Sequence, residues 1–368
     1  MKRVLHVLDM LSYGSGVAMV VMNYLRYIDK SRYVFDVVVH KPGEKALVDE
    51  VESLGGRVYL LTDITLSGFL KYYREFSDIL INNKYDIVHG HISNAAFLYM
   101  TQAKKNGVSH RIIHAHNAVG AETIFKRLRN SLLEARIPVW CNHLFACSDL
   151  AAKYLFPTKN IGDVIIMPNA IDTDRFCFDA SLRKEFRGKL KVLDNTFCVG
   201  HIGRFSLQKN HRFLLNAFRS IKKIHPNSML CLVGDGPLSE EIQGLAAEYG
   251  LTSSVFFAGL VKDTTPFYAA FDIMLLPSLF EGWPVVGIEA QAEGLPCLFS
   301  SNITKTAKII EEVVFLDLAS PEEWAVKAVD LWKRTKRKEQ SSFIKEKGMD
   351  IRTQAKALAD IYDSYINN

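Results

Sequence analysis

The stretch "DIMLLPSLFEGWPVVGIEAQAEG" (residues 272–294) says most about the fold and the function of this chain. Its first part is a short continuous apolar run, which is typical of a strand that is buried on both faces of a parallel sheet. Pro284 favours the first turn of a helix, because the N–H that proline lacks would have no partner there. The stretch therefore predicts a buried strand, a loop that holds Glu281, and a helix that reaches Gly294 with Glu289 on its second turn.

Apolar runs and helical patterns alternate along the rest of the chain. Residues 16–27 and 69–82 read as helices in the first half, and helices are expected from Arg212, Ser239 and Thr265 in the second. This alternation predicts an α/β fold of doubly wound, parallel sheets. The runs that predict strands are "RVLHVLD", "FDVVVHK", "RVYLL", "YDIVHGH", "RIIHAHN", "HLFACS" and "VIIMPN", and then "FCVGHIGR", "SMLCLVGDG", "VFFAG", "DIMLLPS" and "PCLFSS".

The length of 368 residues is too great for one ordinary domain and suggests two. The polar segment "DTDRFCFDASLRKEFRGKLKVLDNTF" lacks a strand-like run, which places the junction near residues 175–195. We predict a Rossmann-like domain over residues 1–180 and a second over residues 181–350. Residues 351–368 carry apolar side chains at helical spacing, so we expect an amphipathic helix that returns to the N-terminal domain.

The composition narrows the class of protein. Hydrophobic residues make up 48% and charged residues 23%, which is typical of a globular protein. The net charge of +5 is too weak to indicate nucleic acid as a partner, but it is compatible with anionic ligands. The six cysteines form no CxxC pair, and no apolar stretch approaches the roughly 20 residues of a membrane-spanning helix. We therefore expect a cytoplasmic protein.

Two groups of residues follow predicted strands, where open parallel sheets bind ligands. Gly14 and Gly16 follow the first strand and would let a ligand approach the backbone before a helix N-terminus; an ordinary strand–helix turn is the alternative. Arg204 and Lys209 follow a strand of the second half and could neutralise a diphosphate leaving group. A pair of solvated surface cations is the alternative there.

The third group is the pair of carboxylates around Pro284. Glu281 precedes the predicted helix in a loop with Gly282, and the N–H groups of Trp283, Val285 and Val286 could hold a phosphate. Carboxylates are good acceptors for vicinal hydroxyls, so the layout fits a ligand with sugars on both sides of a diphosphate.

These residues carry a resemblance to a known family. "EGWPVVGIEA" resembles the E-x7-E motif of glycosyltransferase family 4, and "GRFSLQKNH", "LVGDGP", "VFFAG" and "GLPCLFS" resemble its C-terminal domain in the same order. "IMPNAIDTDRF" resembles the family's lead into the interdomain linker. "YGSGVAMVVMNYLR", "YDIVHGH" and "RIIHAHN" resemble the branch that makes bacterial capsular polysaccharides and exopolysaccharides.

The resemblance implies the GT-B fold, two Rossmann-like domains that face a central cleft, and a retaining transfer of sugar from a nucleotide-sugar, expected to be a UDP-hexose or UDP-N-acetylhexosamine. The acceptor would be a hydroxyl of a glycan or of a lipid-linked saccharide, with no metal and no other cofactor. The resemblance also implies roles for the site residues. Glu289 would bind the ribose, Glu281 and His116 would bind the donor sugar, and Val261 would border the base. The diphosphate would be bound by Arg204, Lys209 and the amides of Gly282 to Val286, and the loop with Gly14 and Gly16 would close over the phosphate and the sugar.

Three other signals allow more than one interpretation. Asp172-Thr173-Asp174 is a DxD triplet, which we interpret as part of the linker rather than as a metal site. The pairs His89/His91 and His114/His116 each put two imidazoles on one strand face, and we expect them to line a cleft rather than to bind zinc. The segment "TIFKRLRNSLLEARIPVW" (residues 123–140) is basic and amphipathic, which suggests peripheral contact with an anionic membrane; a core-facing helix gives the same pattern.

Two other functions remain open at this stage. One is a nucleotide-sugar epimerase of the same fold, such as a UDP-N-acetylglucosamine 2-epimerase, although the E-x7-E layout favours transfer. The other is a catalytically silent partner that binds a nucleotide-sugar, although Arg204, Lys209, Glu281 and Glu289 are all present.

Overall fold

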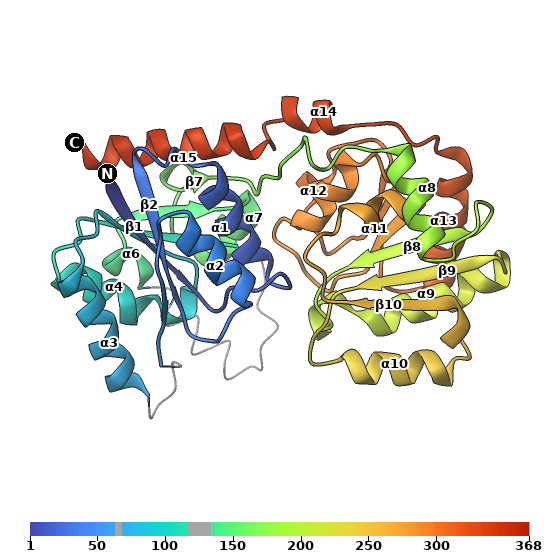
Figure 1. The fold of residues 1–368 in the computed structure, drawn as a ribbon, viewed down its shortest axis with the longest axis horizontal. Helices are drawn as coiled ribbons and strands as arrows, with labels where there is room; N and C mark the ends of the chain where they lie inside the picture. The colour runs from blue at the N-terminus through green and yellow to red at the C-terminus, as the bar shows by residue number, and fades with distance from the viewer. Residues whose placement is uncertain (63–67, 117–133, 135, 368) are drawn as a thin grey trace. The chain divides into compact units, whose positions relative to one another are not determined.

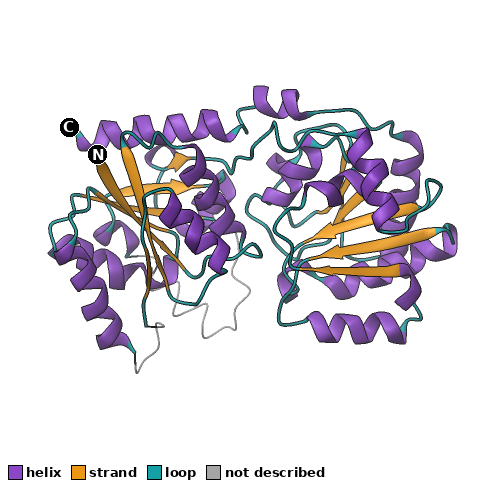
Figure 2. Cartoon of the chain, viewed as in Figure 1, coloured by secondary structure: helices purple, strands orange, loops and turns teal. Residues whose placement is uncertain are grey.

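The computed structural model describes residues 1–62, 68–116, 134 and 136–367. The chain divides into two compact units. Unit 1 comprises Met1–Ala170 and Ile351–Asn368, and unit 2 comprises Ile171–Asp350. Each unit is an α/β sandwich with helices on both faces of its sheet, as Figure 2 shows. The α/β class and the parallel sheets that the sequence predicts are confirmed.

Unit 1 is built on a seven-stranded parallel sheet in the order β3-β2-β1-β4-β5-β6-β7. Its strands are β1 (Lys2–Leu8), β2 (Tyr33–Val39), β3 (Val58–Leu60), β4 (Ile87–Gly90), β5 (His110–Ala115), β6 (His143–Ala146) and β7 (Ile165–Ile166). Its helices are α1 (Gly16–Tyr27), α2 (Lys45–Ser53), α3 (Phe69–Asn82), α4 (Ala96–Lys105), α6 (Ile137–Trp140), α7 (Asp149–Leu155) and α15 (Ile351–Ile366).

The predicted helices 16–27 and 69–82 have the bounds of α1 and α3. The continuous apolar character of β2, whose seven residues are all buried, reflects helices on both faces of the sheet. The terminal helix α15 packs against α1, which confirms that the C-terminal helix docks on the N-terminal domain (Figure 1). Its apolar stripe is buried at Ile351, Ala355, Leu358 and Tyr362.

Unit 2 has a six-stranded parallel sheet in the order β10-β9-β8-β11-β12-β13. Its strands are β8 (Phe197–Ile202), β9 (Ser228–Val233), β10 (Val255–Gly259), β11 (Ile273–Leu276), β12 (Cys297–Ser300) and β13 (Val313–Leu316). Its helices are α8 (Ala180–Lys189), α9 (His211–Ile224), α10 (Ser239–Glu248), α11 (Thr265–Ala270), α12 (Val285–Ala292), α13 (Pro321–Arg334) and α14 (Ser341–Glu346). Its core is formed by aromatic and aliphatic side chains of the central strands and of the helices α9, α10 and α13.

Two elements of unit 2 differ from the sequence-based expectation. The polar segment after residue 172 contains α8, which Asp179 caps by accepting hydrogen bonds from the N–H groups of Ser181 and Leu182. Arg183 and Arg187 fix α8 to the sheet, because both donate to the carboxylate of Asp272 just before β11. The edge strand β13 was not predicted, since its four apolar residues follow two glutamates and three of them are only partly buried.

Candidate functional site

The topological switch point of unit 2 lies between β8 and β11, where the strand order reverses. Open parallel sheets bind ligands at this place, beyond the carboxyl ends of the strands. The loop after β8 carries Arg204 and Lys209, and the loop after β11 carries Glu281. The two loops are joined by hydrogen bonds from Leu279 N to Gln208 O (2.8 Å) and from Gln208 Nε2 to the carbonyl of Phe280 (3.0 Å).

Lys209 and Glu281 form an ion pair at this switch point. Lys209 Nζ donates to Glu281 Oε1 over 2.6 Å, and the two side chains are only 15% and 10% exposed. The backbone of Glu281 pairs with Ile303 in an isolated parallel bridge, which fixes the loop from its other side. Arg204, in contrast, is exposed. The structure therefore brings two of the predicted site residues into direct contact and leaves Arg204 at the surface.

The helix after Glu281 begins where Pro284 predicts. Pro284 is the N-cap of α12, and its carbonyl accepts from the N–H groups of Gly287 and Ile288. The N–H groups of Val285 and Val286 lie in the first turn, where a helix supplies no acceptor, and the positive end of the helix dipole favours an anion. The helix ends at Ala292, two residues before the predicted end, because Gly294 has a φ of +67° that ends the helical path.

Glu289 has a partner that the sequence analysis missed. The hydroxyl of Tyr268, which lies within α11, donates to Glu289 Oε2 over 2.7 Å, and Tyr268 is fully buried. Burial raises the pKa of the Glu289 carboxyl to about 7, while the hydrogen bond from Tyr268 acts in the opposite direction. In the sequence, Tyr268 is marked only by its position in "TPFYAA" just before a predicted strand, and this position does not predict its contact with Glu289.

The loops after β8 and β9 approach closely because Gly234 has no side chain. Gly234 follows β9 with a φ of +131°, and a Cβ there would lie 2.2 Å from the carbonyl oxygen of Gly203. The N–H of Gly234 donates to Gly259 at the end of β10 (2.8 Å). Val261 is partly buried two residues beyond β10, so it lies at the same strand edge as the other predicted donor-binding residues of unit 2.

The predicted site residues of unit 1 also lie beyond strand ends. Ser15 caps α1 by accepting from the N–H of Ala18, and the N–H of Gly14 donates to Ser12 Oγ over 3.1 Å. Gly16 is exposed, and a Cβ there would meet no atom within 4 Å, so the space above the first turn of α1 is open. His116 directly follows β5, and its Nε2 lies 2.8 Å from His91 Nδ1.

The expectation that both HxH pairs line a cleft is wrong for two of the four histidines. His89 and His114 are 2% and 3% exposed, because they lie in the middle of the sheet face and pack against Phe145. His89 also contacts Tyr362 of α15, with 2.7 Å between His89 Nδ1 and the hydroxyl. The spacing predicted that the two histidines of each pair share a strand face, but the burial of His89 also depends on Tyr362 of α15, which lies against it.

Three other predicted features have different outcomes. Within the described residues, the carboxylates of the DxD triplet belong to no group with metal-binding geometry; the buried hydroxyl of Thr173 donates to Asp350 Oδ2 over 2.6 Å. Most of the basic segment of residues 123–140 lies outside the described residues. No helix in the described parts of the chain has the length and apolar character to span a bilayer.

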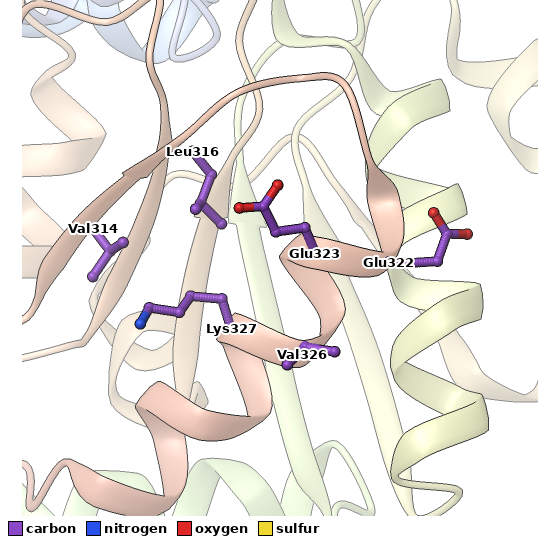
Figure 3. Close-up of a pocket in the computed structure, with 6 residues that line it drawn as sticks. All are labelled: Val314, Leu316, Glu322, Glu323, Val326 and Lys327. Carbon is purple, nitrogen blue, oxygen red and sulfur yellow. The ribbon is translucent and has the colours of Figure 1, made fainter.

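A surface pocket of unit 2 contains none of these predicted residues. It lies between β13 and α13, as Figure 3 shows, and Val314 and Leu316 form its strand side. Glu322, Glu323, Val326 and Lys327 line it from the helix. The pocket is therefore separate from the strand ends that carry Lys209, Glu281 and Glu289.

Comparison with known proteins assigns the family. The family model "Glycosyltransferase Family 4" matches residues 14–175, and the model "Glycosyl transferases group 1" matches residues 183–347. The "Putative glycosyltransferase EpsF" of Bacillus subtilis (strain 168) is 33% identical over 371 residues, which cover 98% of this chain and 96% of that protein. The chain belongs to glycosyltransferase group 1/family 4.

A further relative of this family 4 glycosyltransferase and a solved structure with a similar fold are informative. The "UDP-Gal:alpha-D-GlcNAc-diphosphoundecaprenol alpha-1,3-galactosyltransferase" of Escherichia coli is 26% identical over 304 residues, which cover 78% of this chain and 76% of that protein. The crystal structure of Anabaena Alr3699/HepE in complex with UDP-glucose matches with a TM-score of 0.81 at 19% identity, over 99% of this chain and 100% of that chain. This structural match shows the GT-B fold, which confirms the fold that the resemblance implied.

Proposed function

We propose that this glycosyltransferase transfers a sugar from a UDP-hexose or UDP-N-acetylhexosamine to a hydroxyl of a glycan or lipid-linked saccharide, with retention of configuration, in the synthesis of a surface polysaccharide. One relative and one solved structure support the substrate class. The Escherichia coli relative is named as a galactosyltransferase that acts on UDP-Gal and alpha-D-GlcNAc-diphosphoundecaprenol, and the HepE structure contains UDP-glucose.

The observation that carries the proposal is the ion pair between Lys209 and Glu281 at the switch point of unit 2. An ammonium group has three donors, so Lys209 can keep its bond to Glu281 and still donate to a phosphate oxygen. Glu281 retains acceptor positions for the hydroxyls of the donor sugar. One residue of the pair thus serves the diphosphate and the other serves the sugar, and each holds the other in place.

The other parts of the donor, which are the ribose, the base and the diphosphate, are assigned to other residues beyond the strand ends. Glu289, which Tyr268 orients, would accept from the ribose hydroxyls, and Val261 would border the base. The first-turn amides of Val285 and Val286, with those of Gly282 and Trp283, would donate to the diphosphate. In unit 1, the residues that would contact the phosphate or the sugar are Gly14, Gly16 and His116. In unit 2, Arg204 would add a second cation beside Lys209.

These groups support a front-side displacement. The new bond from the acceptor oxygen to the anomeric carbon forms on the face from which the phosphate oxygen leaves. The electron pair of the broken bond goes to that phosphate oxygen, which takes the proton of the acceptor hydroxyl. Cations and amide donors that stabilise the developing negative charge are then the main contribution of the protein.

The test is a panel of UDP-sugars incubated with the full chain and a lipid-linked saccharide acceptor. We expect release of UDP together with a glycosylated product whose anomeric configuration, read by NMR, equals that of the donor. Inversion at C2 of the sugar without transfer would indicate the epimerase, and binding without turnover would indicate the silent partner. Either result would contradict the proposal.

A further inference from the structure

One face of the sheet in unit 1 carries a group of five histidines from three neighbouring strands. His6 of β1 is in register with His89 of β4, and His89 is in register with Ile112 of β5. Side chains two residues apart on a strand point to the same face, and in-register neighbours share that face. His91, His114 and His116 therefore lie on the same face as His6 and His89, in the direction of the carboxyl ends of the strands.

The imidazole nitrogens of this group are close together. His91 Nε2 lies 3.0 Å from His6 Nδ1, and His91 Nδ1 lies 2.8 Å from His116 Nε2. The ring of His114 stacks on that of His116 with 4.2 Å between centroids. One nitrogen of each of His91, His114 and His116 lies within 4.8 Å of the other two. His114 Nε2 is buried and has no hydrogen-bond partner in the described part of the chain.

We propose that His91, His114 and His116 form a three-nitrogen site for a first-row divalent cation, with Zn²⁺ as the best match and a fourth coordination position left open. Zn²⁺ binds histidine nitrogen at about 2.0–2.1 Å in tetrahedral geometry, which places two such ligands roughly 3.3 Å apart. Small movements of these side chains would give that spacing. The ion would also supply a partner to the buried His114 Nε2, and leaving a buried polar atom without a partner is destabilising.

The hydrogen-bond geometry of the group fits metal binding by neutral imidazoles. A neutral imidazole has one nitrogen that donates and one that accepts. If His91 Nε2–H donates to His6 Nδ1, its Nδ1 has the free lone pair that a metal requires, and His6 becomes the outer partner that orients the ligand.

The alternative group of His6, His89 and His91 also has ligand atoms within 4.8 Å of one another. Because His91 Nε2 is the nitrogen that faces His6, this group would use His91 Nε2 as a ligand, and a neutral His91 can offer only one of its nitrogens at a time. His6 and His89 are each 2% exposed, whereas His91 and His116 are partly exposed, so an ion can reach the second group more easily. The structure therefore favours His91, His114 and His116.

The metal site shares His116 with the proposed donor site but does not rest on the proposed function, and the ion is given no step in sugar transfer. The test uses the untagged full chain, stripped with a chelator and then titrated with Co²⁺. We expect the visible absorption of tetrahedral Co²⁺ to saturate at about one equivalent and to disappear when Zn²⁺ is added. X-ray absorption of the Zn²⁺ form should show three imidazole nitrogens at about 2.0–2.1 Å.

Variants locate the ion. His114→Asn and His116→Asn should each weaken Co²⁺ binding by at least about tenfold. The control is His110→Ala at the opposite end of β5, where His110 Nδ1 lies 3.2 Å from His143 Nε2 in a similar histidine pair. It should bind Co²⁺ like the parent chain. The proposal is wrong if the parent chain retains no metal, if fewer than three imidazoles are seen, or if the control loses binding as strongly as the two site variants. The absorption measurement on the parent chain needs no variant, so poor folding of a variant leaves the test intact.

Discussion

Lys209 Nζ and Glu281 Oε1 lie 2.6 Å apart, although 72 residues separate them in the sequence. Both side chains are at most 15% exposed, so water screens their attraction only weakly. Removal of one partner leaves the other as a buried charge without its counter-ion, which is more costly than the loss of a surface ion pair. The two residues should therefore behave as one unit in binding the donor.

We expect Glu281→Ala and Lys209→Ala each to lower kcat/KM by at least about tenfold, or roughly 1.4 kcal/mol of transition-state stabilisation. The double variant should lose less than the sum of the two single losses, because each single variant already breaks the pair. Initial rates of UDP release over a series of donor concentrations give these values. Unchanged turnover in both single variants would contradict the assignment.

A matched control exists in the same unit. Arg212 Nε and Glu241 Oε1 are also 2.6 Å apart, but their side chains are 62% and 41% exposed. Glu241→Ala should change neither kcat/KM nor the thermal stability measurably, since exposed ion pairs contribute about 0–1 kcal/mol. Comparing Glu241→Ala with Glu281→Ala shows whether the loss of activity comes from the place of the ion pair at the switch point or from the loss of an ion pair in general.

The pH dependence of donor binding tests the role of Glu289. Its carboxyl has a pKa raised to about 7 by burial, so the acceptor form is lost as the pH falls through that value. If Glu289 accepts from the ribose hydroxyls, the KM for the UDP-sugar should fall by up to about tenfold as the pH rises from about 6 to about 8. Glu289→Gln should raise KM and flatten this profile. A Gln variant that keeps the parent slope would show that another group titrates.

Tyr268→Phe refines the same measurement. The tyrosine hydroxyl donates to Glu289 Oε2 and lowers the pKa of the carboxyl against the effect of burial. Without that donor the pKa of Glu289 should rise, so the midpoint of the KM profile should move to higher pH. A purely structural role of Tyr268 would change stability or kcat and leave the midpoint in place.

Local patterns were sufficient for much of the fold. The apolar runs predicted the strands from β1 to β12, and the periodicity of residues 16–27 and 69–82 gave the bounds of α1 and α3. Pro284 placed the start of α12 correctly because its effect depends only on the backbone of its own turn. The helix α8 was missed because Arg187 is its only fully buried side chain, so it shows no apolar stripe, and tertiary ion pairs to Asp272 hold it.

The sequence predicted that the site residues follow the ends of strands, but it did not predict which of these residues contact one another. Lys209 and Glu281 were each assigned to a ligand, yet nothing in their spacing indicates that they pair with each other. The partnership of Tyr268 with Glu289 likewise depends on how α11 and α12 pack beside the sheet. The histidines of the HxH pairs were assigned to one face by the period of two, while their contacts with one another depend on the register of β1, β4 and β5.

The docking of α15 on unit 1 can be tested through Tyr362, which is fully buried and lies against His89. Tyr362→Ala should destabilise unit 1 by about 3–5 kcal/mol because it leaves a large cavity, and Tyr362→Phe by about 1 kcal/mol through the lost hydrogen bond. Asp360→Ala on the exposed side of α15 is the control. Hydrogen exchange should accelerate in β1 and β4 and stay unchanged in β9; equal acceleration in both units would mean that α15 is not specific to unit 1.

The loops after β8 and β9 approach so closely that a substitution at Gly234 should disturb the donor site. At Gly234 an alanine Cβ would lie 2.2 Å from the backbone oxygen of Gly203, and the φ of +131° is strained for any L side chain. A backbone atom cannot move aside as a flexible side chain can, so Gly234→Ala should displace the loop that begins at Gly203 and carries Lys209. We expect a higher KM for the donor and a lower melting temperature. Gly244→Ala is the matched control, because a Cβ there meets no atom within 4 Å and the residue lies inside α10, where alanine stabilises by about 1 kcal/mol. If both variants bind donor like the parent chain, the loop position does not control the donor site.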